Sequence, residues 1–579
     1  MVNAVDAYGG KRAVTQPAAF RVRTPDTFWA NRWMPVPALV TAELVVLVAT
    51  VVAAVFGKPW WIGVIVGAVL AVPALARRSG MSFVRLTGAR TGYLLRRLRT
   101  PELVFEPPFD VPLAEGGSCG LRWDGDRVIT MIRIESNPRA LTRFAPGRTI
   151  TDDVVPLDLI AECLHQFDIA LESADIVSHG SRAYGTSNIA RIYGNILGPL
   201  PATAFRSVTV VLRLDPLANA DAIERRGSGS TGVIKTAVVA TRRIANRLSA
   251  KGHAATILTA AEINSVFGSL MEGTQPGSLA ESWDHVDAGP TTARVFRLDA
   301  AALAEPGLGA PWTVPSLSTS LTLHIRPAAG DTEDVHVSGL ARFTTLSTDE
   351  VPVPDGFHPC NGRQLDAFLA GLPLADPFAD RAFLEYLTDR DSLATLALPA
   401  AGCGQLIGAD DQGRAVALSL VGSNVRTVEI AGTLHLSQQV VLRAIALGAR
   451  VMVYTDRPAH WMPMAHSIGD PQVLSVAGAA AGSQIAGRRQ GYSVLVHDGV
   501  ASEGVSAEVT IITVTAAGLA TTPGADVSLI QNADAGPRVT VRSGSETDQI
   551  VMVATEDEMQ YIGASLNAPD RVLRVARRR

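Results

Sequence analysis

A glycine-rich segment followed by a lysine is the stretch of this chain that comes nearest to a phosphate-binding site. Residues 227–232 read Gly-Ser-Gly-Ser-Thr-Gly and match G-x-G-x-x-G, and Lys235 follows after two further residues. In a phosphate-binding loop the lysine comes directly after the last glycine, and a strand ends just before the loop. Two extra residues turn a helix by about 200°, which points Lys235 away from a phosphate, and the preceding strand is expected to end near Asp215. A loop that begins a helix is therefore favoured over a nucleotide site.

A serine between glycines is a second candidate, in this case for nucleophilic catalysis. Residues 116–120 read Gly-Gly-Ser-Cys-Gly and match G-x-S-x-G, the turn on which many hydrolases present their serine. That turn requires a strand before the serine and a helix after it. Here a proline-containing loop precedes Ser118 and a strand is expected to follow it, so a glycine-rich turn is the favoured interpretation.

Acidic residues suggest two possible metal sites. Asp124 and Asp126 flank a glycine between two predicted strands, and such a pair could hold the metal of a glycosyltransferase-like enzyme. A hairpin turn is favoured, because Asp-Gly between strands is a strong turn signal. Residues 494–498 are expected to form a strand that ends in an acid, where magnesium could bind. The turn at 432–437 lacks the lysine of a phosphate loop, so an active ATPase is not favoured.

Cysteine and histidine spacing does not suggest a metal centre. The four cysteines include no C-x-x-C pair, and no H-E-x-x-H is present, which argues against zinc clusters and a disulfide framework. We therefore expect no catalytic residues, no cofactor and no metal.

Two apolar runs near the N-terminus are expected to form membrane-spanning helices. Residues 36–56 contain a single charge, Glu43, residues 60–76 contain none, and three residues separate the runs. A spanning helix needs about 20 apolar residues, with a range of roughly 17–25, so the sequence predicts a transmembrane hairpin. An ionisable group inside a membrane is costly, and we expect Glu43 to contact a partner helix there.

Charge predicts the direction of this hairpin and excludes one class of partner. Residues 1–99 carry 13 Lys and Arg against 3 Asp and Glu, whereas the rest of the 579-residue chain carries 38 against 52. Positively charged flanks stay inside, which predicts that both termini and the main body are cytoplasmic. The acidic remainder argues against nucleic-acid binding. The side chains expected at the membrane interface are Trp29, Trp33, Trp60, Trp61, Arg77 and Arg78.

The body after residue 100 alternates predicted strands and helices, which is typical of α/β folds. A β-α-β unit is expected from strands at 425–432 and 449–456 and a helix near 437–447, and it resembles a degenerate nucleotide-binding fold. The predicted organisation is a basic tail (1–33), the transmembrane hairpin (34–77), a basic connector helix (78–100), an α/β domain (101–345), a linker (346–363), a second α/β unit (364–515) and a β-rich extension with a basic tail (516–579).

Several longer stretches carry a resemblance to a known family. They are PLDLIAECLHQFDIALESADIVSHGSR at 156–182, YGNILGPLP at 193–201, VTVVLRLDP at 208–216, ADAIERRGSGSTG at 220–232 and AIALGARVMVYTDRPAHW at 444–461. With the basic tail, the apolar hairpin and the arginine-rich connector, they resemble EccE, the membrane-anchored component of the type VII (ESX) secretion machinery of mycobacteria and their relatives. The clearest part of the resemblance covers roughly residues 30–345.

The resemblance implies a structural, non-catalytic membrane subunit that contributes to the assembly and stability of a translocon in the inner membrane. Its implied partners are EccD-, EccB- and EccC-like components and membrane lipids, with no nucleic acid. Two alternatives remain from the residues themselves: a membrane-anchored glycosyltransferase-like enzyme and, less favoured, a nucleotide-binding regulatory ATPase-like subunit.

Overall fold

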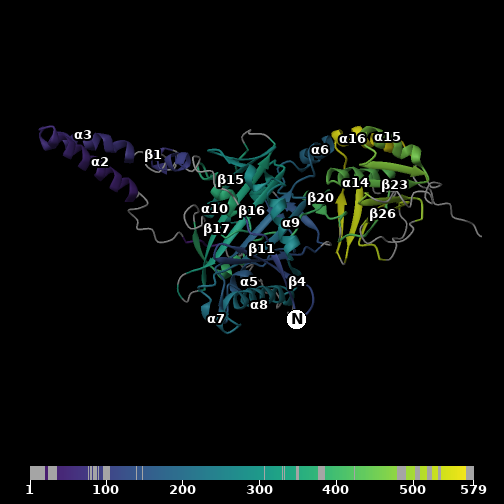
Figure 1. Ribbon diagram of the computed structural model, residues 1–579. Coiled ribbons are helices and arrows are strands. Elements are labelled where there is room, and N and C mark those ends of the chain that lie inside the picture. Colours follow the sequence, from purple (N-terminus) through teal and green to yellow (C-terminus); the bar gives the residue numbers. More distant parts are fainter. Residues whose placement is uncertain are drawn as a thin grey trace, which may run out of the picture.

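The computed structural model of the chain contains a helical hairpin, a large antiparallel sheet with helices, and a second, mixed sheet (Figure 1). The structure describes residues 20–23, 36–75, 77–78, 81–82, 88, 90–95, 105–137, 140–145, 148–304, 307–328, 330, 333–346, 351–375, 385–422, 424–478, 491–501, 509–517, 524–532, 536–544 and 546–568. Trp29 and Trp33 lie outside the described residues, and so do the side chains of Arg77 and Arg78 in the short strand β1 (Arg77–Arg78), which pairs with β2 (Met81–Ser82).

The N-terminal apolar runs form helices α2 (Val36–Val55) and α3 (Trp60–Leu75), which pack side by side and project from the body (Figure 1). Gly63 and Gly67 lie one turn apart on the face of α3 that meets α2. A Cβ added at either glycine would lie within 2.6 Å of an α2 Cα atom. The two helices therefore reach this separation only because both positions lack a side chain.

These helices correct the prediction of a transmembrane hairpin. Within the part of the chain that the structure describes, no helix combines the length and the apolar character that crossing a membrane requires. The prediction of spans at 36–56 and 60–76 is therefore wrong. Helix α3 has 16 residues and is about 24 Å long, shorter than the roughly 30 Å apolar core of a bilayer, while the charged residue Glu43 interrupts the apolar sequence of α2.

The first sheet is antiparallel throughout. Its strands follow the order β13-β14-β15-β17-β16-β10-β11-β5-β4-β3, and β12, β18 and β19 pair with β5, β15 and β17. The bounds are β3 (Phe109–Pro112), β4 (Ser118–Asp124), β5 (Arg127–Ile134), β10 (Ser173–Ser181), β11 (Phe205–Leu214), β12 (Ala255–Ile257), β13 (Leu279–Glu281), β14 (Val286–Ala288), β15 (Thr291–Leu298), β16 (Ser318–Pro327), β17 (Asp334–Thr345), β18 (Phe357–Pro359) and β19 (Tyr386–Asp389).

The antiparallel pairing differs from the α/β arrangement expected for this part of the chain. Helix α6 (Asn188–Leu197) separates β10 from β11 in sequence, yet these strands are antiparallel neighbours, with Ser173 opposite Arg213. The helix packs into the core of the second sheet through Ile189 and Tyr193. Because α6 does not cross over the first sheet, the chain re-enters this sheet at the same end from which it left, with Ser181 opposite Phe205.

Helices cover both faces of the first sheet. Alternate residues of β5 point to opposite faces: Val128 and Ile132 join the core under α5 and α8, and Ile129 and Met131 join the core under α9 and α11. The helical segments of this unit are α5 (Leu157–Glu162), α7 (Ala220–Glu224), α8 (Gly229–Ala250), α9 (Ala260–Leu270), α10 (Ala300–Leu303), α11 (Gln364–Ala370) and α13 (Arg390–Leu393), with 3-10 turns η1 (Pro276–Ser278) and η2 (Gly307–Thr313).

The second sheet is parallel over half its width. Its order is β24-β23-β25-β26-β22-β27-β28-β29-β20-β21-β6-β7, and pairing is parallel from β24 to β27 and antiparallel beyond. The strands are β6 (Thr142–Ala145), β7 (Arg148–Ile150), β20 (Gln405–Asp410), β21 (Ala415–Leu418), β22 (Thr427–Ala431), β23 (Val451–Thr455), β24 (Leu474–Gly478), β25 (Val494–Asp498), β26 (Thr510–Thr515), β27 (Val527–Gln531), β28 (Arg538–Ser543) and β29 (Glu546–Val551); the helical segments are α14 (Leu434–Ala446), α15 (Pro458–Ile468), α16 (Glu556–Ile562) and η5 (Gly563–Asn567).

The last two strands of this second sheet come from early in the sequence. Strand β6 pairs with β21, with Phe144 opposite Ala415, and β7 pairs with β6. Phe144 is buried in the second core, and Arg143 forms an ion pair with Asp548 at 2.8 Å. The two sheets are therefore joined by a segment that the chain inserts between β5 and α5.

Both sides of the helical hairpin are attached to the first sheet. Before α2, Arg23 exchanges backbone hydrogen bonds with Leu387 of β19 at 2.7 and 2.9 Å. After α3, the Tyr93 ring packs edge-on against Trp283 with centroids 5.7 Å apart. The chain therefore leaves the body and returns to it at two fixed points.

Candidate functional site

The structure places the phosphate-loop candidate between two helices. Helix α7 ends at Glu224 and α8 begins at Gly229 within the glycine-rich run, so no strand leads into it. Lys235 is an exposed residue in the second turn of α8. The arrangement therefore lacks the strand–loop–helix order that presents backbone N–H groups to a phosphate.

The other two N-terminal motifs lie in hairpin turns. Ser118 is the first residue of β4, which follows the β3–β4 turn, and no helix follows it. Asp124 and Asp126 flank the β4–β5 turn, where Asp124 accepts a hydrogen bond from the Ala375 backbone at 2.6 Å and Asp126 pairs with Arg127 at 2.7 Å. Both carboxylates are therefore occupied by protein partners.

The carboxyl edge of the parallel strands in the second sheet holds a buried acid with several hydrogen-bond donors. The carboxylate of Asp498, at the end of β25, is fully buried. It accepts hydrogen bonds from Thr455 Oγ1 at 2.9 Å, from Arg457 Nε and Nη2 at 2.8 and 3.0 Å, and from Trp461 Nε1 at 2.9 Å. A guanidinium therefore stands where a metal ion would have to bind.

In the turn after β22, the polar groups that could bind a phosphate form hydrogen bonds within the protein. Thr433 caps α14 by accepting a hydrogen bond from the Leu436 backbone. The backbone N–H and the hydroxyl of Thr433 both donate to Gln531 Oε1, at 3.1 and 3.0 Å. The position where a nucleotide-binding fold would hold phosphate is thus engaged in hydrogen bonds between Thr433, at the start of α14, and Gln531 of β27.

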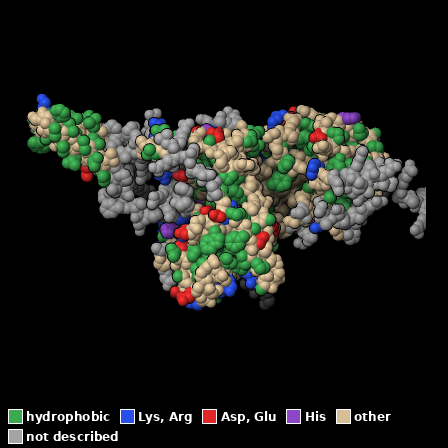
Figure 2. Space-filling model, in the orientation of Figure 1, with side chains coloured by type: hydrophobic (Ala, Val, Ile, Leu, Met, Phe, Trp, Pro, Cys, Tyr) green, Lys and Arg blue, Asp and Glu red, His purple; other side chains and the backbone are tan. Residues whose placement is uncertain are grey.

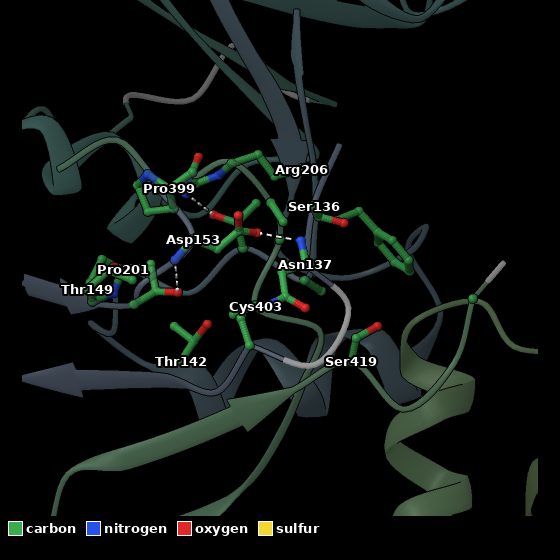
Figure 3. Close-up of a pocket in the computed structure, with 18 of the residues that line it drawn as sticks. Ser136, Asn137, Thr142, Thr149, Asp153, Pro201, Arg206, Pro399, Cys403 and Ser419 are labelled. Carbon is green, nitrogen blue, oxygen red and sulfur yellow. Dashed lines mark hydrogen bonds between the residues drawn. The ribbon is translucent and has the colours of Figure 1, made fainter. Parts of the chain in front are cut away.

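A polar cavity lies where the two sheets meet, and none of the candidate site motifs identified in the sequence contributes to it. Its volume is about 280 Å³, and its walls come from the end of β5, the β6–β7 hairpin, the start of β11 and the loops around 399–403 and 419–424 (Figure 3). The side chains on its walls include Ser136, Asn137, Thr142, Thr149, Asp153, Arg206, Cys403 and Ser419. No spacing in the sequence signals this cavity, because its walls come from segments far apart in the chain.

Arg206 is the cation of this cavity. Its guanidinium donates to the Pro399 carbonyl at 3.4 Å and to Thr203 Oγ1 at 3.1 Å, and it lies 4.1 Å from the centre of the Trp312 ring. Among the described residues, no acceptor faces its buried Nε atom. Burial lowers the pKa of Arg206 to about 10, so the group remains charged at neutral pH.

The other ionisable groups of the cavity do not form a catalytic set. Asp153 accepts a backbone hydrogen bond from Asn137 at 2.9 Å, and burial raises its pKa. Burial raises the pKa of Cys403 to about 11, so its thiol stays protonated and is a poor nucleophile. Within the described ranges, no group of three or more His, Cys, Asp or Glu side chains could hold a metal ion. The cavity can bind a small polar group, but it does not pair a nucleophile with a base.

Among the predicted interface and contact residues, those whose side chains the structure describes lie on the hairpin. Trp60 and Trp61 begin α3 and expose 68% and 52% of their surface. Glu43 is exposed near the start of α2. The structure thus brings these residues onto one projecting element, distant from the cavity (Figure 1).

Comparison with known proteins shows which family this chain is similar to. The family described as "Putative type VII ESX secretion system translocon, EccE" matches residues 202–298, which include β11, α7, α8 and α9. The ESX-1 secretion system protein EccE1 of Mycolicibacterium smegmatis is 27% identical over 393 residues, covering 68% of this chain and 76% of that protein. EccE1 of Mycobacterium tuberculosis is 25% identical over 370 residues, covering 60% and 77%. The ESX-5 secretion system protein EccE5 of Mycobacterium marinum is 26% identical over 331 residues, covering 54% and 80%. The family-model match covers two of the segments that carry the resemblance, 208–216 and 220–232, and together with these relatives it supports the resemblance of this chain to the EccE family of type VII secretion proteins.

Proposed function

We propose that this protein is a structural, non-catalytic subunit of an ESX secretion complex, and that it holds other core components together through its helical hairpin. The observation that supports this role is the apolar surface of α2 and α3. Figure 2 shows hydrophobic side chains over most of the visible face of the hairpin. Leu44, Leu47 and Val51 expose 57%, 63% and 55% of their surface, and they lie on one face of α2. Exposed apolar surfaces of this extent mark interaction sites.

The partners in this proposal are EccD-, EccB- and EccC-like subunits, because the matched family and the named relatives all belong to ESX systems. Glu43 lies beside the exposed leucines on α2. A carboxylate within an apolar contact needs a hydrogen-bonding or charged partner. We propose that a polar group of a partner subunit supplies it.

Co-purification from a host that carries the cognate ESX system tests this role. The tagged full-length protein should retain the other core components, and replacing Leu44, Leu47 and Val51 with serine should reduce their recovery at least tenfold. Glu43→Leu should reduce recovery partially. The matched control is Val553→Ser. Val553 exposes 63% of its surface and follows β29 in the unit built on the second sheet, here called the second body. This variant should leave recovery unchanged. Parental recovery by the triple variant would contradict the proposal.

A further inference from the structure

One phenylalanine of this protein is fully exposed and also held in an unfavourable backbone conformation. Phe167 connects the short strands β8 (His165–Gln166) and β9 (Ile169–Ala170). Its side chain has a relative exposure of 101%, and its φ is +55°. Residues other than glycine rarely adopt this conformation, and such strain persists mainly where function requires it.

The hairpin that carries Phe167 is fixed to the body. Gln166 donates to the carbonyls of Cys163 at 2.9 Å and Ala240 at 3.3 Å, which ties the hairpin to α8. Asn219 exchanges hydrogen bonds of 2.8 Å with both backbone groups of Ala170. The phenylalanine is therefore presented in a set position and loses little freedom when it docks.

A second exposed apolar side chain stands on the neighbouring loop. Leu217 exposes 81% of its surface, in the loop between β11 and α7 that also contains Asn219. Its backbone N–H donates to Asp215 at 2.8 Å. Because Asn219 joins this loop to the hairpin, Phe167 and Leu217 are displayed on one connected support.

Three arginines gather on the Asp168 carboxylate, which adjoins Phe167 in the chain. The Asp168 carboxylate contacts three guanidinium groups, those of Arg226 at 2.7 Å, Arg225 at 3.3 Å and Arg243 at 4.0 Å. Arg243 also lies 5.4 Å from the centre of the Phe167 ring. The side chains of Arg225 and Arg243 remain 60% and 39% exposed. One carboxylate cannot neutralise three cations, so the cluster formed by Asp168 and its three arginines is net positive beside the apolar tip.

We infer that Phe167, Leu217, Arg225 and Arg243 form a docking surface for another protein subunit of the ESX complex, one with an apolar pocket bordered by Asp or Glu side chains. This inference rests on the proposed function for the existence of the complex, but it concerns the end of the body near α7 and α8, away from the hairpin of α2 and α3 (Figure 1). A shaped pocket suits a single rigid aromatic side chain. An anionic lipid surface is the alternative occupant that the crosslinking experiment distinguishes from a protein.

Photo-crosslinking in the full complex tests the contact. p-Benzoylphenylalanine at position 167 of the full-length protein, in a host with the cognate ESX system, should form an adduct with one other ESX subunit, and the crosslinked peptide should contain Asp or Glu. Adduct yield should fall at least fivefold in Arg225→Glu/Arg243→Glu. The same probe at exposed Leu566 of the second body is the control. An adduct with lipid or a second copy, or none in a complex that still co-purifies, would overturn this inference alone; failure of the parental protein to co-purify would instead overturn the proposed function.

Backbone strain provides an independent second readout. Phe167→Gly relieves the positive φ, so the variant should melt at a higher temperature than the parent and yet give at least fivefold lower recovery of the docked subunit. Ser228→Gly is the matched control, since Ser228 has a φ of +54° and makes no side-chain capping hydrogen bond; it should not lower recovery. Parental recovery with Phe167→Gly would show that Phe167 is not part of a contact.

Discussion

Trp461 and Asp498 are joined by a buried hydrogen bond, in which the indole Nε1 donates to Oδ2 over 2.9 Å. The same carboxylate accepts from Arg457 and Thr455, so one acid at the end of β25 anchors the loop and helix that follow β23. In an active nucleotide-binding fold, an acid at this edge would hold a magnesium ion. Here its hydrogen bonds attach α15 to the sheet.

Removing this carboxylate should destabilise the protein strongly. In Asp498→Ala, Arg457 and Trp461 lose a buried acceptor, and breaking a buried ion pair on one side costs roughly 3–5 kcal/mol. Urea unfolding should show this loss in the second body. Asp411→Ala, in the exposed β20–β21 turn, should change the unfolding free energy by no more than about 0.5 kcal/mol. A loss below about 1 kcal/mol for Asp498→Ala would mean that the network is not a structural anchor.

Lys235→Ala should leave ESX-dependent secretion unchanged. The lysine is exposed on α8, and although its Nζ atom lies near Gly227, the helix follows another helix and not the strand that a phosphate loop requires. Secreted substrate in the culture medium is the measurement. Lys251→Ala, at the other end of the same helix, is the control. A secretion defect at normal protein level for Lys235→Ala alone would favour a nucleotide site.

Acid should destabilise the first sheet through His179. Burial and the nearby Arg342 cation lower the pKa of His179 to about 3, below the value of about 6.5 in an unfolded chain. Between these values only the unfolded state takes up the proton, so stability falls as pH decreases from about 6.5 toward 3, by at most about 1.4 kcal/mol per pH unit. His179 Nδ1 lies 2.8 Å from Ser320 Oγ, and His179→Asn can keep that hydrogen bond.

The measurement is the unfolding free energy at pH 6.5 and pH 4.5. The parent should lose more stability over this interval than His179→Asn does. The exposed His466 provides the control, because His466→Asn should retain the parental pH dependence. Identical slopes for the parent and His179→Asn would contradict the expectation.

Phe144→Ala should destabilise the second body although the residue lies early in the chain. Phe144 is 2% exposed within the second core, and truncating a buried phenylalanine costs about 3–5 kcal/mol. Hydrogen exchange should show lost protection of the amides in β21, its pairing partner. Ile150→Ala on β7, where Ile150 is 38% exposed, should have a much smaller effect. Unchanged protection of β21 with Phe144→Ala would mean that β6 contributes little to this sheet.

Local features of the fold could be predicted from the sequence, and long-range pairing could not. The Asp-Gly turn at 124–126 and the β22–α14–β23 unit lie where their patterns indicate, although α14 begins at Leu434 because Thr433 caps it. The addition of β6 to β21 depends on contacts between residues more than 250 positions apart, for which turn and periodicity signals give no information. Length and hydropathy also predicted membrane spans at 36–56 and 60–76, whereas no described helix has the length and apolar character of a span.

The candidate cavity illustrates the same limit. Arg206 and Asp153 belong to no sequence motif, and the residues on either side of them give no signal of a binding site. They face a shared cavity because the β6–β7 hairpin brings its own sheet against the start of β11. Phe167 could not be identified from the sequence either, because its positive φ is a property of the folded backbone.

The β6–β7 hairpin also sets the order in which the protein can be completed on the ribosome. Strand β21 emerges about 270 residues after β6, and at translation rates of roughly 5–20 residues per second that interval lasts roughly 15–55 s. An isolated two-stranded hairpin is marginally stable in water. Strand β6 therefore lacks its partner β21 while the rest of the first sheet is synthesised. The nascent chain therefore exposes an unpaired strand edge for much of its synthesis. A chaperone that binds such edges would protect the chain from aggregation during that period.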